Sequence, residues 1–118
     1  MRVVIETIAH EDQRYDTIGD WEFKGEELSI KVSETGEEDY NFLIAVHELV
    51  EAWLCRARGI EEEKVSAFDK AFNGPGEPGD DIKAPYRDEH CIATGFERML
   101  CGTLALSWEE YEVAVDSL

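Results

Sequence analysis

Basic residues are scarce in this chain of 118 residues, which has 11 lysines and arginines against 28 aspartates and glutamates. The formal net charge is therefore −17 at pH 7. A field of that sign repels phosphate backbones and anionic membranes, so we expect no direct nucleic-acid binding and no membrane partner. The excess of carboxylates suits cation binding or a basic protein partner, and most of it is expected to form a solvated face.

Cysteines and long apolar runs are also scarce. The three cysteines, Cys55, Cys91 and Cys101, have no CxxC spacing, which argues against a disulfide framework or a zinc knuckle. We expect reduced thiols that fill the core, although Cys91 lies beside His90 and leaves a nucleophilic role open. No apolar stretch approaches a membrane span, and the N-terminal one is too short for a signal peptide. These absences predict a soluble, cytoplasmic protein.

Two common catalytic signatures are missing as well. The segment GPGEPGDD contains glycines but lacks the Lys-Ser/Thr of a phosphate-binding loop and does not follow a predicted strand. No GxSxG motif occurs. A nucleotide-cradling loop and a serine-nucleophile elbow are therefore excluded.

The first part of the chain has the alternation typical of β-strands. Residues 2–8 are rich in β-branched side chains, and residues 21–23 and 28–32 flank a turn at Gly25, which predicts a hairpin. We expect a small antiparallel sheet of about three strands within residues 1–34.

Helical periodicity follows over residues 35–118. Thr35 and Glu38 match a capping box that opens a helix ending at Gly59. Further helices are predicted over 61–72, from about Pro85 to Ala105, and after a second capping box at Ser107 and Glu110, with a loop at 73–85. The prediction is one α+β domain over residues 1–118, in which three to four helices pack on one face of the sheet.

The segment VHELVEAWLCRARG places a histidine and two carboxylates in a largely apolar helix. At about 100° per residue, His47 and Glu51 point together into a partly apolar environment, and Glu48 lies at the edge of the polar strip. A buried carboxylate must be paired, protonated or bound to a cation. Two interpretations follow: a hydrogen bond between His47 and Glu51, or a divalent metal ion held by both.

A metal hydrolase site needs a third protein ligand and an open position for water. His90, which flanks the apolar arc of the third helix, completes a set of two histidines and one carboxylate that suits Zn, Fe(II) or Mn. The alternative for His90 is a half-buried residue with a hydrogen-bonding partner. Asp69 is the rival ligand, with a salt bridge to Arg58 or Arg98 as its alternative role.

Several other side chains are candidates for supporting roles. Glu97 is expected either to orient His90 or to form a salt bridge. His10 is expected to be exposed in its loop, with a place at the edge of the cleft as the alternative. The aromatic residues that we expect in the core are Trp21, Phe23, Tyr40, Trp53, Phe68, Phe72, Phe96 and Trp108.

The sequence HELVE at residues 47–51 resembles the HExxH helix of zincin metallopeptidases, with Glu51 in place of the second histidine. This resemblance implies that His47 and Glu51 bind zinc and that Glu48 is the general base. It also implies a zincin-like layout, in which a small sheet precedes the active-site helix, and it requires the second histidine to come from elsewhere. The chain further resembles small uncharacterised proteins of phage and prophage type, a similarity that assigns no activity.

Three functions are compatible with these features. The preferred one is a metal-dependent hydrolase that acts on a peptide or a small molecule, with Zn as the metal and Fe, Mn or Ni as alternatives. The pair Glu48 and Glu51 also resembles half of the Mg-binding set of all-α nucleotide pyrophosphohydrolases. The third is a non-catalytic acidic protein that occupies a basic partner, as DNA mimics do.

Overall fold

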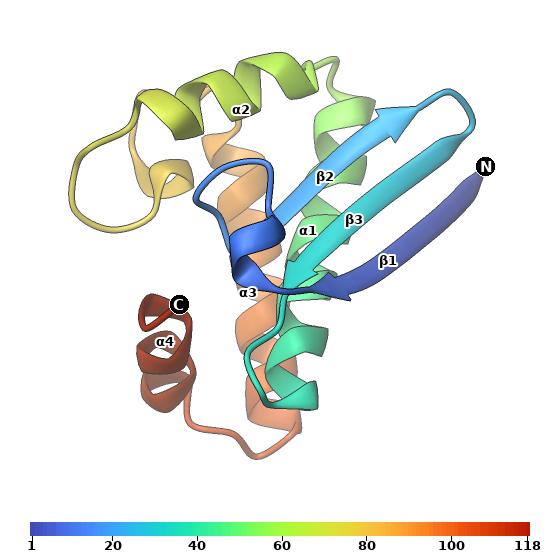
Figure 1. Ribbon diagram of the computed structural model, residues 1–118. Helices are drawn as coiled ribbons and strands as arrows, with labels where there is room; N and C mark the ends of the chain where they lie inside the picture. Colours follow the sequence, from blue (N-terminus) through green and yellow to red (C-terminus); the bar gives the residue numbers. More distant parts are fainter.

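A three-stranded sheet packs against a long helix in the computed structural model, which describes residues 1–118 (Figure 1). The elements in chain order are β1 (Arg2–Ile8), β2 (Gly19–Lys24), β3 (Glu27–Ser33), α1 (Glu38–Ala57), α2 (Glu62–Ala71), α3 (Arg87–Thr103) and α4 (Trp108–Asp116). Short 3₁₀ turns, η1 (His10–Asp12) and η2 (Pro78–Asp80), lie in two of the loops. The predicted α+β class, with strands first and helices after, is confirmed.

The sheet is mixed, with strand order β1-β3-β2. Strand β3 pairs antiparallel with β2, as the predicted hairpin requires, but parallel with β1. The prediction of a purely antiparallel sheet is therefore wrong for β1. Side chains alternate in the same way in both kinds of sheet, so the pattern of residues 2–8 carries no strand direction.

The loop between β1 and β2 crosses the end of β3 to reach the other edge of the sheet. The backbone N–H of Ser33 donates to the Ile18 carbonyl at 2.8 Å. The side-chain amide of Gln13 donates to the Ser33 hydroxyl at 3.1 Å. These bonds hold the loop against the sheet, where it forms one wall of the site described below.

The core lies between the sheet and α1. Leu28, Ile30 and Val32 alternate along β3 and are at most 1% exposed, and they form one cluster with Leu43 and Ile44 of α1. Burial of each such side chain contributes about 1.5–3 kcal/mol. This packing fixes the orientation of α1, and with it the direction in which His47 and Glu51 point.

Helix α3 runs antiparallel beside α1. Arg58, just after α1, pairs with Glu89 in the first turn of α3 at 2.6 Å, whereas His47 in mid-α1 contacts Glu97 farther along α3 at 2.7 Å. The pairing brings His90, near the start of α3, against the C-terminal half of α1.

Of the two predicted capping boxes, only the one at Ser107 forms its N-cap hydrogen bond. The Ser107 hydroxyl accepts a hydrogen bond from the Glu110 backbone N–H at 3.2 Å. Helix α1, by contrast, has Glu37 at its N-cap and no side-chain cap, because the Thr35 hydroxyl donates to Asn41 at 2.7 Å instead. The capping box predicted at Thr35 is therefore wrong, although the helix ends near Gly59 as expected, with φ of 72° at that glycine.

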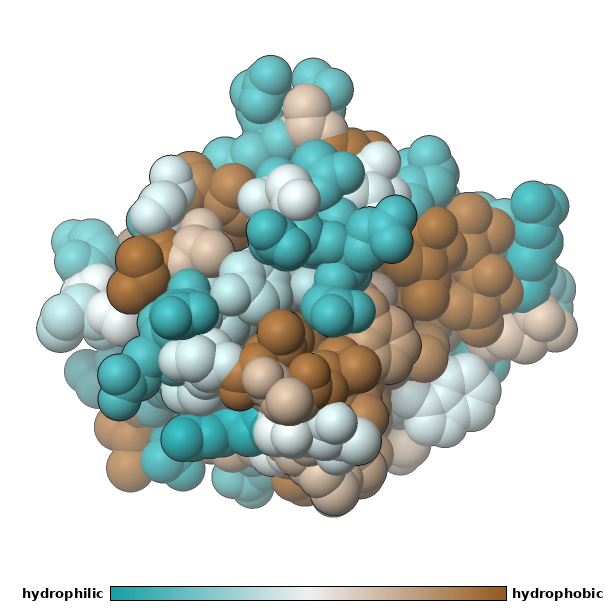
Figure 2. Space-filling model, turned by 90° about the horizontal axis from the view of Figure 1, so that it is seen from below, coloured by the Kyte–Doolittle hydropathy of each residue, from teal (hydrophilic) through white to brown (hydrophobic).

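Two aromatic residues predicted to be in the core lie at the surface. Trp53 of α1 is 49% exposed and Phe96 of α3 is 44% exposed, because no further layer covers the outer faces of these helices. Figure 2 shows that on the face it presents, apolar residues form patches separated by hydrophilic ones. None of the helices combines the length and apolarity needed to span a bilayer.

Candidate metal centre

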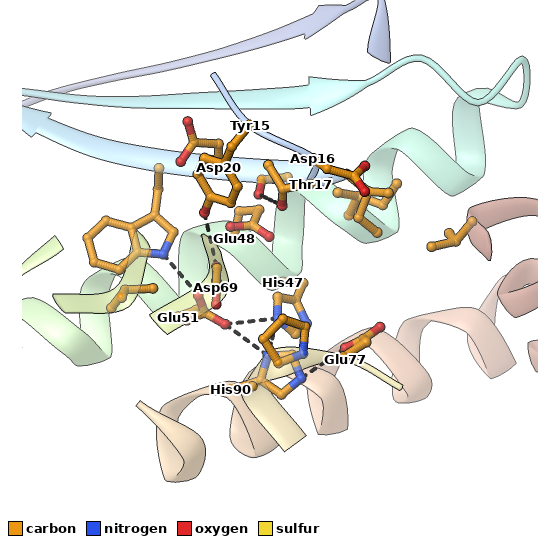
Figure 3. A pocket seen from close by; sticks show the side chains of 18 of the residues that line it. Tyr15, Asp16, Thr17, Asp20, His47, Glu48, Glu51, Asp69, Glu77 and His90 are labelled. Carbon is orange, nitrogen blue, oxygen red and sulfur yellow. Dashed lines mark hydrogen bonds and ion pairs between the residues drawn. The ribbon is translucent and has the colours of Figure 1, made fainter. Parts of the chain in front are cut away.

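A cavity of about 320 Å³ opens where α1, β2, α2, the start of α3 and the loop before it meet (Figure 3). The first residues of β2 form one wall, and the face of α1 that carries His47, Glu48 and Glu51 forms another. Its size is at the lower end of the range found for small-molecule sites.

Three of the predicted ligand residues converge at this cavity. The Glu51 Oε2 atom lies 3.1 Å from His47 Nε2 and 3.0 Å from His90 Nδ1, and the two nitrogens are 3.2 Å apart. All three side chains are buried, with exposed fractions of 5–7%. His47 and Glu51 come from successive turns of α1, and His90 is brought to them by the antiparallel packing of α3.

The spacing of these three atoms fits a single metal ion. Ligands bound at about 2.0–2.1 Å are about 3.3 Å apart in a tetrahedron and about 3.0 Å apart in an octahedron. The observed separations of 3.0–3.2 Å are close to both values. Two imidazole nitrogens and one carboxylate oxygen suit Zn, Fe(II) or Mn.

These side chains are also held from their far sides. His47 Nδ1 donates to Glu97 at 2.7 Å, which leaves the Nε2 lone pair free to face a metal. Trp21 Nε1 donates to the other oxygen of Glu51 at 3.0 Å, and Tyr111 donates its hydroxyl to Glu97. Carboxylates that orient metal-binding histidines in this way are common around metal sites. Glu97 therefore supports His47, and the expectation that it orients His90 is wrong.

His90 is flanked by the loop that precedes α3. Its Nε2 atom lies 2.9 Å from a Glu77 oxygen and 3.3 Å from an Asp80 oxygen, and both contacts are ion pairs without a hydrogen bond. The Gly79 backbone packs directly on the ring, since a Cβ at that position would lie 2.3 Å from His90 Cγ. The sequence predicts a loop over residues 73–85 and carries no sign of these three contacts.

The two histidines and their neighbouring carboxylates stabilise each other's charged forms. Burial lowers the pKa of His47 and of His90, but hydrogen bonds and charge from neighbouring carboxylates outweigh it, so the pKa of His47 is well above its usual value and that of His90 rises to about 10. Burial raises the pKa of Glu51, and the two histidines outweigh this and lower it to about 2. A metal ion bound by these groups would therefore displace protons, and its affinity would fall at low pH.

Glu48 occupies the same cavity without a partner. It is 8% exposed, and no hydrogen bond or ion pair involves its carboxylate. It lies against the backbone of Gly19, where a Cβ would be 2.4 Å from Glu48 Oε1. Burial, followed by the negative charge of Glu51, raises the pKa of Glu48 well above its usual value. A buried carboxyl group whose pKa is raised in this way can act as a general acid or base.

Asp69, the rival ligand, lies in the cavity wall outside this group. It accepts hydrogen bonds from the hydroxyls of Tyr15, at 2.9 Å, and Tyr86. The predicted alternative of a salt bridge to Arg58 or Arg98 is also wrong. Arg58 pairs with Glu89 at 2.6 Å, and the Arg98 guanidinium lies 4.8 Å from the centre of the Trp108 ring.

The remaining candidates lie at the edge of the site or outside it. His10 lines the cavity and its Nδ1 atom is 2.9 Å from the Ser33 hydroxyl, so the alternative placement at the cleft is the correct one. All three cysteines are free thiols, and Cys55 and Cys101 are buried as expected. Cys91 is exposed and is not a core residue.

Comparisons with protein families, with curated proteins and with solved structures find no match to this chain. The function must therefore be argued from the geometry of the site.

Proposed function

We propose that this protein binds one divalent metal ion, Zn²⁺ in the first place, through His47 Nε2, Glu51 Oε2 and His90 Nδ1. The observation that carries the proposal is the convergence of these three buried atoms within 3.2 Å of one another. The support of each ligand by a separate group, Glu97, Trp21 or the loop before α3, is what a rigid metal site requires.

A purely structural pair of His47 and Glu51 accounts for less of this geometry. A pair needs one imidazole donor for one carboxylate, whereas here two imidazole nitrogens are directed at the same oxygen of Glu51. Without a cation, that arrangement confines two protonated rings with centroids 4.7 Å apart. Burying like charges is costly, and a single ion that replaces both protons removes the repulsion.

We further propose that the site is that of a metal-dependent hydrolase, with the zincin-like arrangement that the HELVE segment implies. A bound divalent ion supplies an activated water and polarises a carbonyl oxygen. Glu48, unpartnered in the same cavity, accepts a proton on its carboxylate and passes it to the leaving group. His47 and His90 are kept in position by Glu97 and by the Gly79 backbone.

Metal content is the decisive measurement for the binding proposal. Elemental analysis by mass spectrometry of tag-free protein should find about one Zn, Fe or Mn per chain in the wild type. The metal should be lost in His47→Ala and in His90→Ala, and retained in His10→Ala, the matched control from the third histidine. A wild type that takes up no stoichiometric metal, even after soaking with Zn²⁺, would establish the structural pair instead.

Hydrolysis is tested separately with Glu48→Gln. The variant should keep its metal and lose activity in a screen of peptide and small-molecule esters and amides. Activity equal to that of the wild type would rule out Glu48 as the base while leaving the metal site intact.

A further inference from the structure

The cavity has a strongly one-sided charge. None of the 25 residues that line it is a lysine or an arginine, and nine of them are acidic. Low-dielectric walls with charges of one sign concentrate ligands of the opposite charge.

Some of these carboxylates are already neutralised. Arg14, outside the lining, pairs with Asp20 at 2.6 Å and with Glu62 at 2.6 Å. Glu51 and Glu97 are held by the two buried histidines. These four groups need no further cation, apart from the metal ion proposed above.

Of the other five acidic residues, Asp16 and Glu77 face His10 and His90, and Asp116 is exposed. Only Glu48 and Asp69 are left without a cationic partner. Glu48 is only 8% exposed, and its carboxylate is directed into the cavity without a hydrogen bond (Figure 3). Asp69 receives only two neutral hydroxyl donors, from Tyr15 and Tyr86. A buried carboxylate without a cation is costly, so this part of the cavity is suited to a positively charged ligand.

The aromatic rings beside Asp69 indicate an organic cation. Tyr15 and Tyr86 both line the cavity, and both direct their hydroxyl groups to Asp69. Ammonium and guanidinium groups combine favourably with a carboxylate and with aromatic rings. The Tyr15 ring already attracts such groups, because Arg14 and Lys70 lie 5.9 and 5.4 Å from its centre. A cavity of about 320 Å³ accommodates one such side chain but no large ligand.

We infer that the part of the cavity formed by Asp69, Tyr15 and Tyr86, beside Glu48, binds an alkylammonium or guanidinium group of the ligand. Asp69 is the carboxylate that pairs with this cation, and Glu48 stays free to act as the base. This inference rests on the proposed function in one respect only, namely that the bound cation is part of the substrate of the proposed metal centre. The same charge argument disfavours nucleoside triphosphates, and with them the nucleotide pyrophosphohydrolase alternative.

The charge preference is tested on the wild-type protein by titration calorimetry. The probes are acetyl-Ala-Arg-Ala-amide, its Gln and Glu counterparts, and agmatine as a free amine. We expect the Arg peptide to bind at least about tenfold more tightly than the Gln peptide, with no binding of the Glu peptide. Binding of agmatine alone supports the inference with a small amine as the source, and binding of the Arg peptide supports a peptide. Equal affinity for the Arg and Gln peptides, including no affinity for any probe, overturns it.

Asp69→Asn locates the site. The substitution should weaken binding of the Arg peptide about tenfold and leave binding of the Gln peptide unchanged. Glu109→Gln is the control: it removes one negative charge at an exposed position of α4 and should change neither affinity. Wild-type affinity in Asp69→Asn overturns the location. If that variant does not fold, the four wild-type titrations decide.

Metal content measured on the same samples separates this inference from the proposed function. Selectivity for the Arg peptide in a wild type that holds no metal refutes the metal site and supports the cation site. Stoichiometric metal without selectivity does the reverse.

Discussion

Replacement of Gly79 by alanine tests how the loop before α3 holds the site. The added Cβ would lie 2.3 Å from His90 Cγ and 2.4 Å from His90 Nδ1, whereas ordinary contacts begin at 3.4 Å. The ring or the loop must therefore move by about 1 Å, since the overlap is with a rigid imidazole and not with the end of a flexible chain.

A displacement of that size is large for a metal ligand. Metal–ligand distances tolerate only about 0.2 Å, and His90 Nδ1 is one of the three proposed ligand atoms. If the loop moves instead, Glu77 and Asp80 leave His90 Nε2, from which they are 2.9 and 3.3 Å away. Either way we expect zinc affinity to fall by about 10–100-fold or more, and stability to fall by about 1–3 kcal/mol.

Chelator competition for Zn²⁺ measures the affinity, and thermal unfolding of the metal-free protein measures the stability. Gly95→Ala is the matched control, because it lies in the same α3 with nothing within 4 Å of an added Cβ. The control should bind zinc like the wild type and be stabilised by about 0.5–1 kcal/mol, as expected for Gly to Ala in a helix. Zinc affinity in Gly79→Ala equal to that of the wild type would refute the role given to the loop.

Three further predictions follow from the same geometry. Gly19→Ala places a Cβ 2.4 Å from Glu48 Oε1, so the carboxylate must swing away, and hydrolysis should fall while metal content stays constant; full activity would contradict this. Glu97→Gln should lower zinc affinity about 10–100-fold in chelator competition by weakening the support of His47, and an unchanged affinity would argue against that support. Burial raises the pKa of Asp69 from 3.8 to about 6, so between these values the folded protein binds more protons than the unfolded chain and its stability falls as pH rises. Since one pKa unit corresponds to about 1.36 kcal/mol, Asp69→Asn should gain about 2.4 kcal/mol relative to the wild type between pH 4 and pH 7 in urea unfolding, and a constant difference would show that Asp69 is not perturbed.

The sequence determined those features that depend on neighbours within one or two helical turns. The side chains of His47 and Glu51 lie on one face of α1 because residues four apart in a helix do so in any context. The Ser107 cap of α4 is equally local. These two interactions need only the residues of one segment, so helical periodicity and the capping motif were sufficient to predict them. The Thr35 motif failed because its hydroxyl donates to Asn41 instead.

Long-range partners were decided by the tertiary structure. His47 and His90 are 43 residues apart, and only the antiparallel packing of α3 on α1 brings their nitrogens to 3.2 Å. The same packing makes Glu97 the hydrogen-bonding partner of His47, although its position within α3 had predicted His90 as the partner. Periodicity gives the face of each helix but neither the neighbour nor the register.

The direction of β1 and the course of the loop before α3 were likewise decided only by the fold. Alternation of side chains is identical in parallel and antiparallel strands, so residues 2–8 carried no sign that β1 runs parallel to β3. Gly79 is indistinguishable in sequence from a turn glycine, and its contact with His90 follows from the packing of the loop against α3. Local chemistry thus fixed which residues were suited to bind a metal ion, and the packing of distant segments determined that they meet.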